Sequence, residues 1–293
     1  MKKFLSVLMA GAMLFGVLTL AGCGDTTTTE DTTTTAEFTT VTEGVLTMST
    51  NAAFPPYEMT DDSGNIVGID AEIAAAIAEK LGLELQIDDM DFDGALAAPQ
   101  SGKSDIVMAG VTVNEERQLV LDFSNTYANG VQKVIVAEGS DITMENLGEQ
   151  QIGTQKGTTG NILTTDEFGE DHVIAYDDAI AAVQALNNGQ IDCVVIDSAV
   201  ADNLVEANPG LTTLDTDYAN EDYAIGVAKG NTALLDAINT ALQELIDDGT
   251  VQSIIDKYIP TDGTAADEAG TTDEAGATDE AGATDGAEAD TAA

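Results

Sequence analysis

Positive charge is scarce in this sequence. Its 53 aspartate and glutamate residues face nine lysines and arginines, which gives a formal net charge of -44. Nucleic-acid binding needs a basic surface that neutralises phosphates, so the composition excludes nucleic acid as a partner. The acidic excess favours solubility and repels anionic partners, although salt limits the reach of this field to a Debye length of about 8 Å.

Cysteine and histidine are nearly absent. The chain has two cysteines, Cys23 and Cys193, and one histidine, His172. Because we assign Cys23 to the N-terminal segment below, no internal disulfide is available, and the apolar neighbours of Cys193 in IDCVVID indicate core packing. His172 lies in a polar stretch with no second histidine or cysteine nearby. We therefore expect a surface histidine, no metal site and no cofactor.

The N-terminal segment has the layout of a secretory signal, with two lysines, an apolar run over 4–20 and small residues before Cys23. A membrane-spanning helix is the alternative, because the run lies near the lower limit of about 17 residues for spanning. LAGC at 20–23 resembles the bacterial lipobox, in which the cysteine is lipidated, with palmitate among its acyl chains. We predict a signal peptide at 1–22 and a protein anchored by lipid to the outer face of the cell membrane.

Two segments lack the apolar residues that a packed core requires. Residues 23–43 are mostly threonine with acidic residues, and we interpret them as a flexible tether. Residues 261–293 repeat a DEAG unit and contain no aromatic or basic residue, which predicts a disordered acidic tail. The globular part is then 44–260, a length that suits one large lobe or two modest ones.

Within the globular part, patterns typical of strands and helices alternate. GVLTMST (44–50) and DIVMAG (105–110) are apolar runs of strand length, and segment 69–81 has an isoleucine or leucine at every fourth position before Gly82. A second strand, helix and strand follow over 151–197. This alternation predicts an α/β fold with parallel sheets, whose ligands bind at the carboxyl ends of strands. A later helix is predicted to bury Leu235, Ile238, Leu242, Leu245 and Ile246.

The loop MAGVTVNEER, residues 108–117, follows one of these strands. Asn114 is placed to cap a short helix, and Arg117 falls in its first turn. A positive side chain there opposes the helix dipole, which invites a functional explanation. An arginine beside backbone donors is suited to bind a carboxylate, and a surface salt bridge is the alternative.

Two further strand ends carry candidate groups. In QKGTTGN, Gly157, Thr158 and Thr159 offer backbone and hydroxyl donors at an expected helix start, although an ordinary turn explains the glycine equally well. Asp197 ends the apolar strand IDCVVID, where it would either pair with a cation or cap the next helix.

Aromatic residues are few, at 4% of the chain. Phe54, Tyr57 and Phe92 stand in two loops near the candidate charges, where they provide either cavity walls or plain core packing. Aromatic walls, one arginine and one aspartate together form a set complementary to a zwitterion.

At this point the sequence resembles the polar amino-acid-binding proteins of bacterial ABC importers, the family 3 solute-binding lipoproteins. The likeness covers 44–259, and its motifs are specific only in combination. They are FPPYEM, GNIVGIDAEIAAAIAEKLG, DFDGALAAPQSGKSDIVMAG, TVNEERQLVLDFSNTY, QKGTTGN, NNGQIDCVVID and KGNTALLDAINTALQEL.

This resemblance implies a type II periplasmic-binding-protein clamshell with two lobes. One lobe would be discontinuous, 44–131 plus 225–260, and the other would be 132–224. Each would hold a mostly parallel sheet flanked by helices. Two strands near QKVIVA and YAIGVA would cross between the lobes and form the hinge.

The resemblance also implies roles for individual residues. Arg117 would grip the ligand α-carboxylate with help from Thr112 and from backbone donors near Gly110 and Thr159, while Asp197 would bind the α-ammonium. Two phenylalanines would sandwich the ligand side chain. The implied ligand-binding residues are Asn51, Phe54, Phe92, Gly110, Thr112, Arg117, Thr158, Thr159 and Asp197.

The implied ligand is a polar amino acid, delivered to an ABC transporter permease by a monomeric binding protein. Asn51 stands where family members with basic ligands carry an acidic residue, and Ala109-Gly110 resembles the glutamine-binding branch. Both features favour a neutral amino acid. The alternatives are a dehydratase-type enzyme on the same fold, for which no histidine or thiol is placed, and a ligand-sensing module.

Overall fold

The computed structural model describes residues 38–216 and 218–260. The predicted signal peptide, the predicted lipidation site Cys23 and the acidic tail lie outside these residues, as does most of the predicted tether. Inside them, no helix combines the length and apolar character needed to span a bilayer.

Strands and helices alternate through the described residues, as the sequence pattern predicts. The strands are β1 (Val45–Thr50), β2 (Ala53–Phe54), β3 (Glu58–Thr60), β4 (Ile66–Val67), β5 (Glu84–Asp89), β6 (Ile106–Val107), β7 (Leu121–Ala137), β8 (Ile152–Gln155), β9 (Val173–Tyr176), β10 (Cys193–Asp197), β11 (Leu211–Thr213) and β12 (Ala219–Ala228). The helices are α1 (Ile69–Leu81), α2 (Phe92–Ala97), α3 (Glu115–Gln118), α4 (Thr159–Phe168), α5 (Ala179–Asn187), α6 (Ser198–Ala207), α7 (Thr232–Asp247) and α8 (Thr250–Tyr258), with a 3-10 turn at Leu147–Glu149.

A nine-stranded sheet runs through the fold in the order β5-β1-β6-β12-β7-β10-β8-β9, with β11 paired to β7. Strand β1 is parallel to β5 and β6, and β8 is parallel to β9 and β10. The two central strands, β12 and β7, are antiparallel to each other and to their outer neighbours. A small separate sheet contains β2, β3 and β4.

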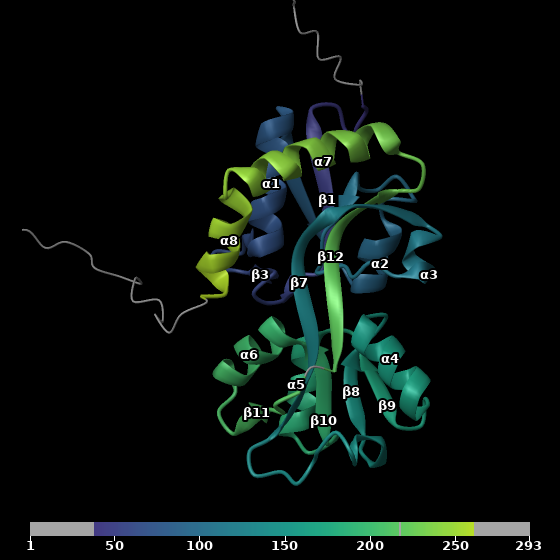
Figure 1. The fold of residues 1–293 in the computed structure, drawn as a ribbon, viewed down its shortest axis with the longest axis vertical. Helices are drawn as coiled ribbons and strands as arrows, with labels where there is room; N and C mark the ends of the chain where they lie inside the picture. The colour runs from purple at the N-terminus through teal and green to yellow at the C-terminus, as the bar shows by residue number, and fades with distance from the viewer. Residues whose placement is uncertain (1–37, 217, 261–293) are drawn as a thin grey trace, which may run out of the picture. The chain divides into compact units, whose positions relative to one another are not determined.

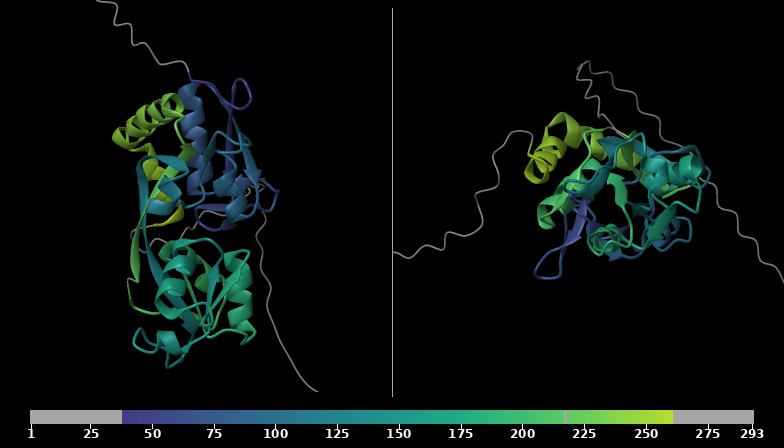
Figure 2. Two further views of the ribbon diagram at one scale, coloured as in Figure 1. Left: turned by 90° about the vertical axis from the view of Figure 1, so that its right-hand side faces the viewer. Right: turned by 90° about the horizontal axis from the view of Figure 1, so that it is seen from below.

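The helices divide into two groups along this sheet (Figure 1). Helices α1, α2, α3, α7 and α8 surround the β1 end, which we call lobe 1, and α4, α5 and α6 surround the β8 end, which we call lobe 2. Strands β7 and β12 run between the lobes, and the left view of Figure 2 shows them along one side. The fold is thus the expected α/β class in two lobes. The residue boundaries given above for the lobes stay a prediction.

Helix burial follows the sequence pattern except in α7, where Leu235 is only half-buried and Ile246 is exposed. Ile69, Ile73 and Ile77 of α1 are fully buried, and Gly82 ends the helix in the left-handed conformation. In α7, however, Ile246 is exposed while Leu234 is buried. The prediction for Ile246 is wrong because the buried face of α7 is centred on the row that begins at Leu234, which leaves Ile246 on its flank.

The predictions for the cysteine and for the histidine have different outcomes. Cys193 is a free thiol buried in β10, as its apolar neighbours predict. His172 is half-buried rather than exposed, and its Nδ1 atom is buried without a hydrogen-bond partner. No cluster of three potential metal ligands occurs in the part of the chain that the structure describes.

The pairing of the two strands that cross between the lobes, β7 and β12, is irregular. The pairing of β7 with β12 shifts register between Tyr223 and Ala224 and again between Ala224 and Gly226. Such bulges bend a strand and redirect its side chains. The irregularity begins at Tyr223, whose hydroxyl reaches the cavity described next.

Candidate functional site

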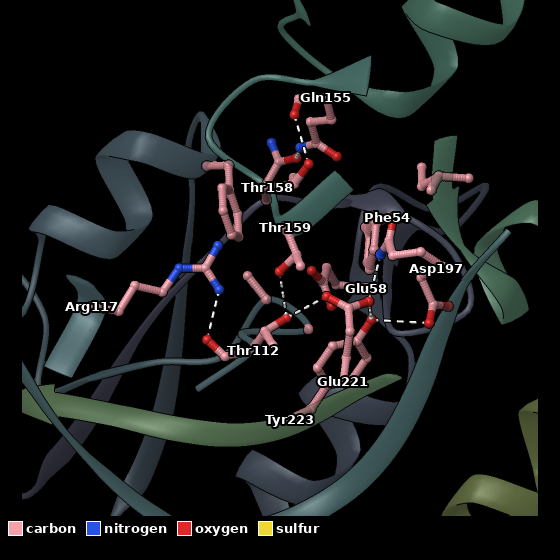
Figure 3. A pocket seen from close by; sticks show the side chains of 16 residues that line it. Phe54, Glu58, Thr112, Arg117, Gln155, Thr158, Thr159, Asp197, Glu221 and Tyr223 are labelled. Atoms are coloured by element: carbon pink, nitrogen blue, oxygen red, sulfur yellow. Dashed lines mark hydrogen bonds between the residues drawn. The ribbon is translucent and has the colours of Figure 1, made fainter. Parts of the chain in front are cut away.

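A small cavity lies between the lobes, lined by residues of both. Each predicted ligand-binding residue lines it: Asn51, Phe54, Phe92, Gly110, Thr112, Arg117, Thr158, Thr159 and Asp197. Figure 3 shows Arg117 on one side and Asp197 on the other, with Thr112 and Thr159 between them. Sequence reasoning missed Glu58, Ala109, Gln132, Gln155, Ile196, Glu221 and Tyr223.

Arg117 is a buried cation, only 6% exposed. Its guanidinium donates to the carbonyl oxygen of Thr112 at 2.7 Å and to that of Gly157 at 3.1 Å, and it lies over the ring of Phe92, 5.2 Å from the centroid. Burial lowers the pKa of Arg117, yet an arginine remains charged at neutral pH. Arg117 takes part in none of the ion pairs among residues 38–216 and 218–260. The alternative interpretation of Arg117, a surface salt bridge, is therefore wrong.

Asp197 performs the capping function considered for it, and its pairing with a cation stays a prediction. It ends β10, and its Oδ1 caps α6 by accepting from the backbone N–H groups of Ala199 and Val200 at 2.9 and 3.1 Å. Its Oδ2 faces the cavity and lies 2.9 Å from the hydroxyl of Tyr223. Burial raises the pKa of this carboxyl to about 7, and the neighbouring Glu221 contributes to the rise.

Glu221 is a second carboxyl group at the same end of the cavity, and it is 4% exposed. Its Oε1 accepts from the hydroxyl of Thr112 at 2.6 Å. Its Oε2 accepts from the side-chain amide of Gln132 and lies 3.1 Å from the Tyr223 hydroxyl. The family resemblance implied only a hinge function for the segment that forms β12, so neither Glu221 nor Tyr223 was predicted to line the site.

Glu58 is the second missed acid, and it is fully buried on β3. Burial and the nearby Asp70 carboxyl raise the pKa of Glu58 well above its usual range. Its two carboxyl oxygens have no hydrogen-bond partner that meets ordinary geometry.

The threonines connect the two lobes. Thr159 of α4 donates its hydroxyl to that of Thr112 at 3.0 Å. Thr158 caps α4, and its hydroxyl donates to the carbonyl of Gln155 at 2.7 Å. Since α4 begins at Thr159, the first N–H groups of this helix lack intrahelical partners and are suited to an anion.

Gly110 differs from its predicted role as a neighbour of free backbone donors. Its own N–H already donates to Asp70 Oδ2 at 2.9 Å, so it is not available to a ligand. Gly110 instead has φ +53°, and a Cβ there would lie 2.8 Å from Cε1 of Phe54. Glycine is therefore needed to let the Phe54 ring lie against the backbone. Tyr57 packs on Phe54 and Tyr223 in the core and does not line the cavity.

An amide pair closes the other end of the cavity. Gln155 at the end of β8 donates to Asn51 Oδ1 at 2.9 Å, and Asn51 donates to the carbonyl of Met90 at 2.8 Å. The Oε1 atom of Gln155 is buried without a partner. This end therefore offers a neutral polar surface with an unsatisfied acceptor.

Contacts across the cleft place the lobes in a closed arrangement. Besides the amide pair and the threonine pair, Lys156 forms an ion pair with Asp93 of α2 at 2.7 Å. Gly157 stands beside this ion pair with φ +74°, and a Cβ on it would overlap Asp93 Oδ1. Closure therefore depends on a residue without a side chain at this position.

We expect Gly157→Ala to weaken ligand binding by roughly 5-fold, because moving Asp93 disrupts the exposed ion pair that assists closure. Gly139→Ala is the matched control, since Gly139 has φ +77° and open space around its Cβ position. Both substitutions should cost about 1 to 2 kcal/mol of unfolding free energy, from the left-handed backbone. Calorimetric titration and chemical denaturation separate the two effects, and equal ligand affinities in both variants would contradict the closure argument.

Comparison with known proteins identifies relatives of the whole globular part. The family model of the bacterial extracellular solute-binding proteins, family 3, matches residues 46–261. A probable histidine-binding protein of Neisseria gonorrhoeae is 31% identical over 230 residues, covering 76% of this chain and 85% of that protein. An ABC transporter glutamine-binding protein of Bacillus subtilis (strain 168) is 32% identical over 205 residues, covering 68% and 75%.

A solved structure agrees with these relatives. An ancestral arginine-binding protein bound to glutamine is 39% identical, with a TM-score of 0.71, and the match covers 74% of this chain and 99% of that one. Its likeness extends over both lobes. The chain therefore belongs to the bacterial extracellular solute-binding proteins, family 3, as the combined motifs of its loops implied.

Proposed function

We propose that this protein captures a free polar amino acid outside the cytoplasm and delivers it to the permease of an ABC transporter. The observation that carries this proposal is the buried guanidinium of Arg117, which has no ion-pair partner among the described residues and shares a cavity with Asp197. A buried charge is costly unless it is paired, so the site is built to receive an anion. The protein is a binding protein rather than an enzyme, as its relatives are.

An α-amino acid supplies both of the charges that the cavity lacks. Its carboxylate would pair with Arg117 and accept from the first N–H groups of α4, and its ammonium would lie against Asp197. These groups belong to different lobes, because Arg117 follows β6 and Asp197 ends β10. A ligand that contacts both stabilises the closed state over the open one, which is the signal for delivery.

We propose a neutral polar side chain for the ligand, because Asn51 and Gln155 present amide groups rather than charges at the far end of the cavity. A cationic side chain is the second candidate. It is favoured by the excess of carboxyl groups, since Asp197 and Glu221 outnumber the single guanidinium. Calorimetric screening of the twenty amino acids decides between the two.

Asn51→Asp tests the selectivity of that end of the cavity. We expect it to raise the affinity for arginine relative to glutamine by about 10-fold or more, because a carboxylate replaces a neutral acceptor. Asn187→Asp, an exposed position on α5, is the matched control and should leave the ratio unchanged. An unchanged ratio in Asn51→Asp would show that the ligand side chain does not reach this position.

We propose that the protein is monomeric, since one chain supplies the whole cavity, and that Cys23 anchors it to the membrane by lipid. Cys23→Ala should move the protein from the membrane fraction to the soluble fraction. Cys193→Ala makes the same chemical change inside β10 and should stay with the membranes. Recovery of the Cys23→Ala protein with the membranes would remove the lipid anchor from the account.

A further inference from the structure

One phenol hydroxyl lies between two buried carboxyl groups. The Tyr223 oxygen is 2.9 Å from Asp197 Oδ2 and 3.1 Å from Glu221 Oε2. A hydroxyl has one hydrogen to donate, so it can serve only one of the two carboxylates at a time. If both carboxylates were ionised, the carboxylate that does not accept the Tyr223 hydrogen would face a lone pair of the phenol oxygen. No hydrogen would then lie between those two oxygen atoms. Both short distances can therefore be hydrogen bonds only when the three groups hold one proton more than the phenol hydrogen alone.

The surrounding hydrogen bonds indicate which oxygen carries that proton. Thr159 donates to Thr112, so the Thr112 hydrogen is directed at Glu221 Oε1, and Gln132 donates to Glu221 Oε2. Glu221 is thus an acceptor on both oxygens. Among the described residues, Asp197 Oδ2 has a hydrogen bond only with Tyr223, because its capping bonds use Oδ1.

We propose that the ligand-free site shares one proton along the chain Asp197–Tyr223–Glu221 and that the ammonium group of the bound amino acid displaces it. Asp197 Oδ2–H donates to the phenol oxygen, and the phenol hydrogen donates to Glu221 Oε2. Binding converts the Asp197 carboxylic acid to a carboxylate and releases the proton to solvent, while the ligand nitrogen keeps its own protons. Glu221 becomes the second carboxylate of the ammonium site. This inference rests on the proposed function.

The neighbouring Glu221 carboxyl raises the pKa of Asp197, whereas the hydrogen bond from Tyr223 lowers it. Tyr57 and Glu58 are also close enough for Asp197 to raise the pKa of each. From strand β7, Gly130 lies against Asp197 and Gln132 donates to Glu221.

Two cations lie further out. Arg117 interacts electrostatically with Glu221 rather than with Asp197. Lys133 forms an ion pair with the exposed Asp202 of α6 at 3.6 Å. Because burial raises the pKa of Asp197 to about 7, its proton is in place in acidic solution, present in about half of the molecules near pH 7 and absent in alkaline solution.

Calorimetric titration of the full chain with glutamine and arginine, in buffers of different ionisation enthalpy, counts the released protons. We expect about one proton per ligand at pH 5 to 6, falling towards none near pH 8.5. The apparent affinity should be about 100-fold weaker at pH 5 than at pH 8, because the proton competes with the ammonium. pH-independent binding without proton release would overturn the inference and leave the proposed function intact.

Two variants distinguish an effect of the Asp197–Tyr223–Glu221 hydrogen-bond chain from a general effect of charge. Glu221→Gln introduces an amide that donates to the phenol oxygen, so Tyr223 can donate to an ionised Asp197. We expect this variant to release its proton only at lower pH than wild type. Asp202→Asn removes a carboxylate that is 61% exposed, and it should match wild type. An unchanged profile in Glu221→Gln would exclude a shared proton.

A measurement without ligand covers the case in which no amino acid binds. Carbon-13 NMR of the side-chain carboxyls should show one aspartate that titrates near pH 7 and is missing from Asp197→Asn. Such a signal supports the shared proton even if every amino acid fails to bind, a result that would remove the proposed function. Titration of Asp197 near pH 4 would overturn the inference by itself.

Discussion

Arg117→Ala is expected to lower the affinity for the amino-acid ligand by about 3 to 5 kcal/mol, or roughly 100-fold or more, with little loss of unfolding free energy. The substitution leaves the ligand carboxylate desolvated without its cation. Folding depends less on this side chain, because its guanidinium bonds are to two carbonyl oxygens, those of Thr112 and Gly157, and to no carboxylate among the described residues. Calorimetry and denaturant titration measure the two quantities separately.

The control for this prediction is Lys103→Ala, which removes an exposed cation from the same lobe. It should bind ligand as wild type does, so that a general charge effect is distinguished from a direct contact. Arg117→Lys tests geometry, because a point charge cannot reproduce the two-pronged guanidinium, and it should recover only part of the loss. An unchanged isotherm for Arg117→Ala would remove Arg117 from the site.

Asp197→Asn is expected to abolish ligand binding and, at pH 8, to stabilise the ligand-free protein by up to about 4 kcal/mol. The carboxylate is fully buried, and its pKa of about 7 lies well above the ordinary value of 3.8. Asparagine still caps α6 with its side-chain oxygen, so the helix start is preserved. Binding strength and stability of the empty protein thus respond in opposite directions.

The pH dependence of the Asp197→Asn effect follows from the raised pKa. The folded protein holds the Asp197 proton more tightly than the unfolded chain, so this group destabilises the folded state as pH rises from about 4 to 7. The stability difference between variant and wild type should therefore vanish near pH 4 and reach its full value above pH 7. Asp202→Asn, at an exposed site on the same helix, should show no such profile. A ligand-free Asp197→Asn protein less stable than wild type at pH 8 would contradict this account.

Three of the predicted site residues share one property that made them recognisable in the sequence. Arg117, Thr159 and Asp197 each follow a strand within a loop or helix start whose local sequence is itself distinctive. Local rules for caps and strand ends apply there, since parallel strands bring their carboxyl ends to one edge of the sheet. These rules identified the three groups as candidates without knowledge of the sheet order, and the resemblance to the family assigned them to one ligand site.

The missed residues depend on long-range pairing. Glu221 and Gln132 lie on β12 and β7, and they meet only because these strands pair in a register that neither sequence encodes locally. Their side chains reach the cavity beside a bulge, which no period-2 pattern predicts. Gln155 is a strand end, yet its partner Asn51 comes from the opposite lobe.

The fold shows the same division between local and long-range information. Helix α1 could be predicted from its isoleucines and from the glycine that ends it. Strands β2, β3 and β4 have two or three residues each, too few for an alternation to be recognised. In α7 the burial of Leu234 and the exposure of Ile246 depend on how the helix packs against its neighbours. Periodicity identifies the helix but not its rotation.

The most direct test of the account compares an amino-acid ligand with two derivatives that each lack one charge. Calorimetric titration would use the best L-amino acid from the screen, its N-acetyl form and its α-carboxamide. Because Arg117 and Asp197 must engage both ends of one molecule, we expect the parent to bind and both derivatives to bind at least 100-fold more weakly. Equal binding of the parent and either derivative would contradict a site that recognises an amino acid by its two charges.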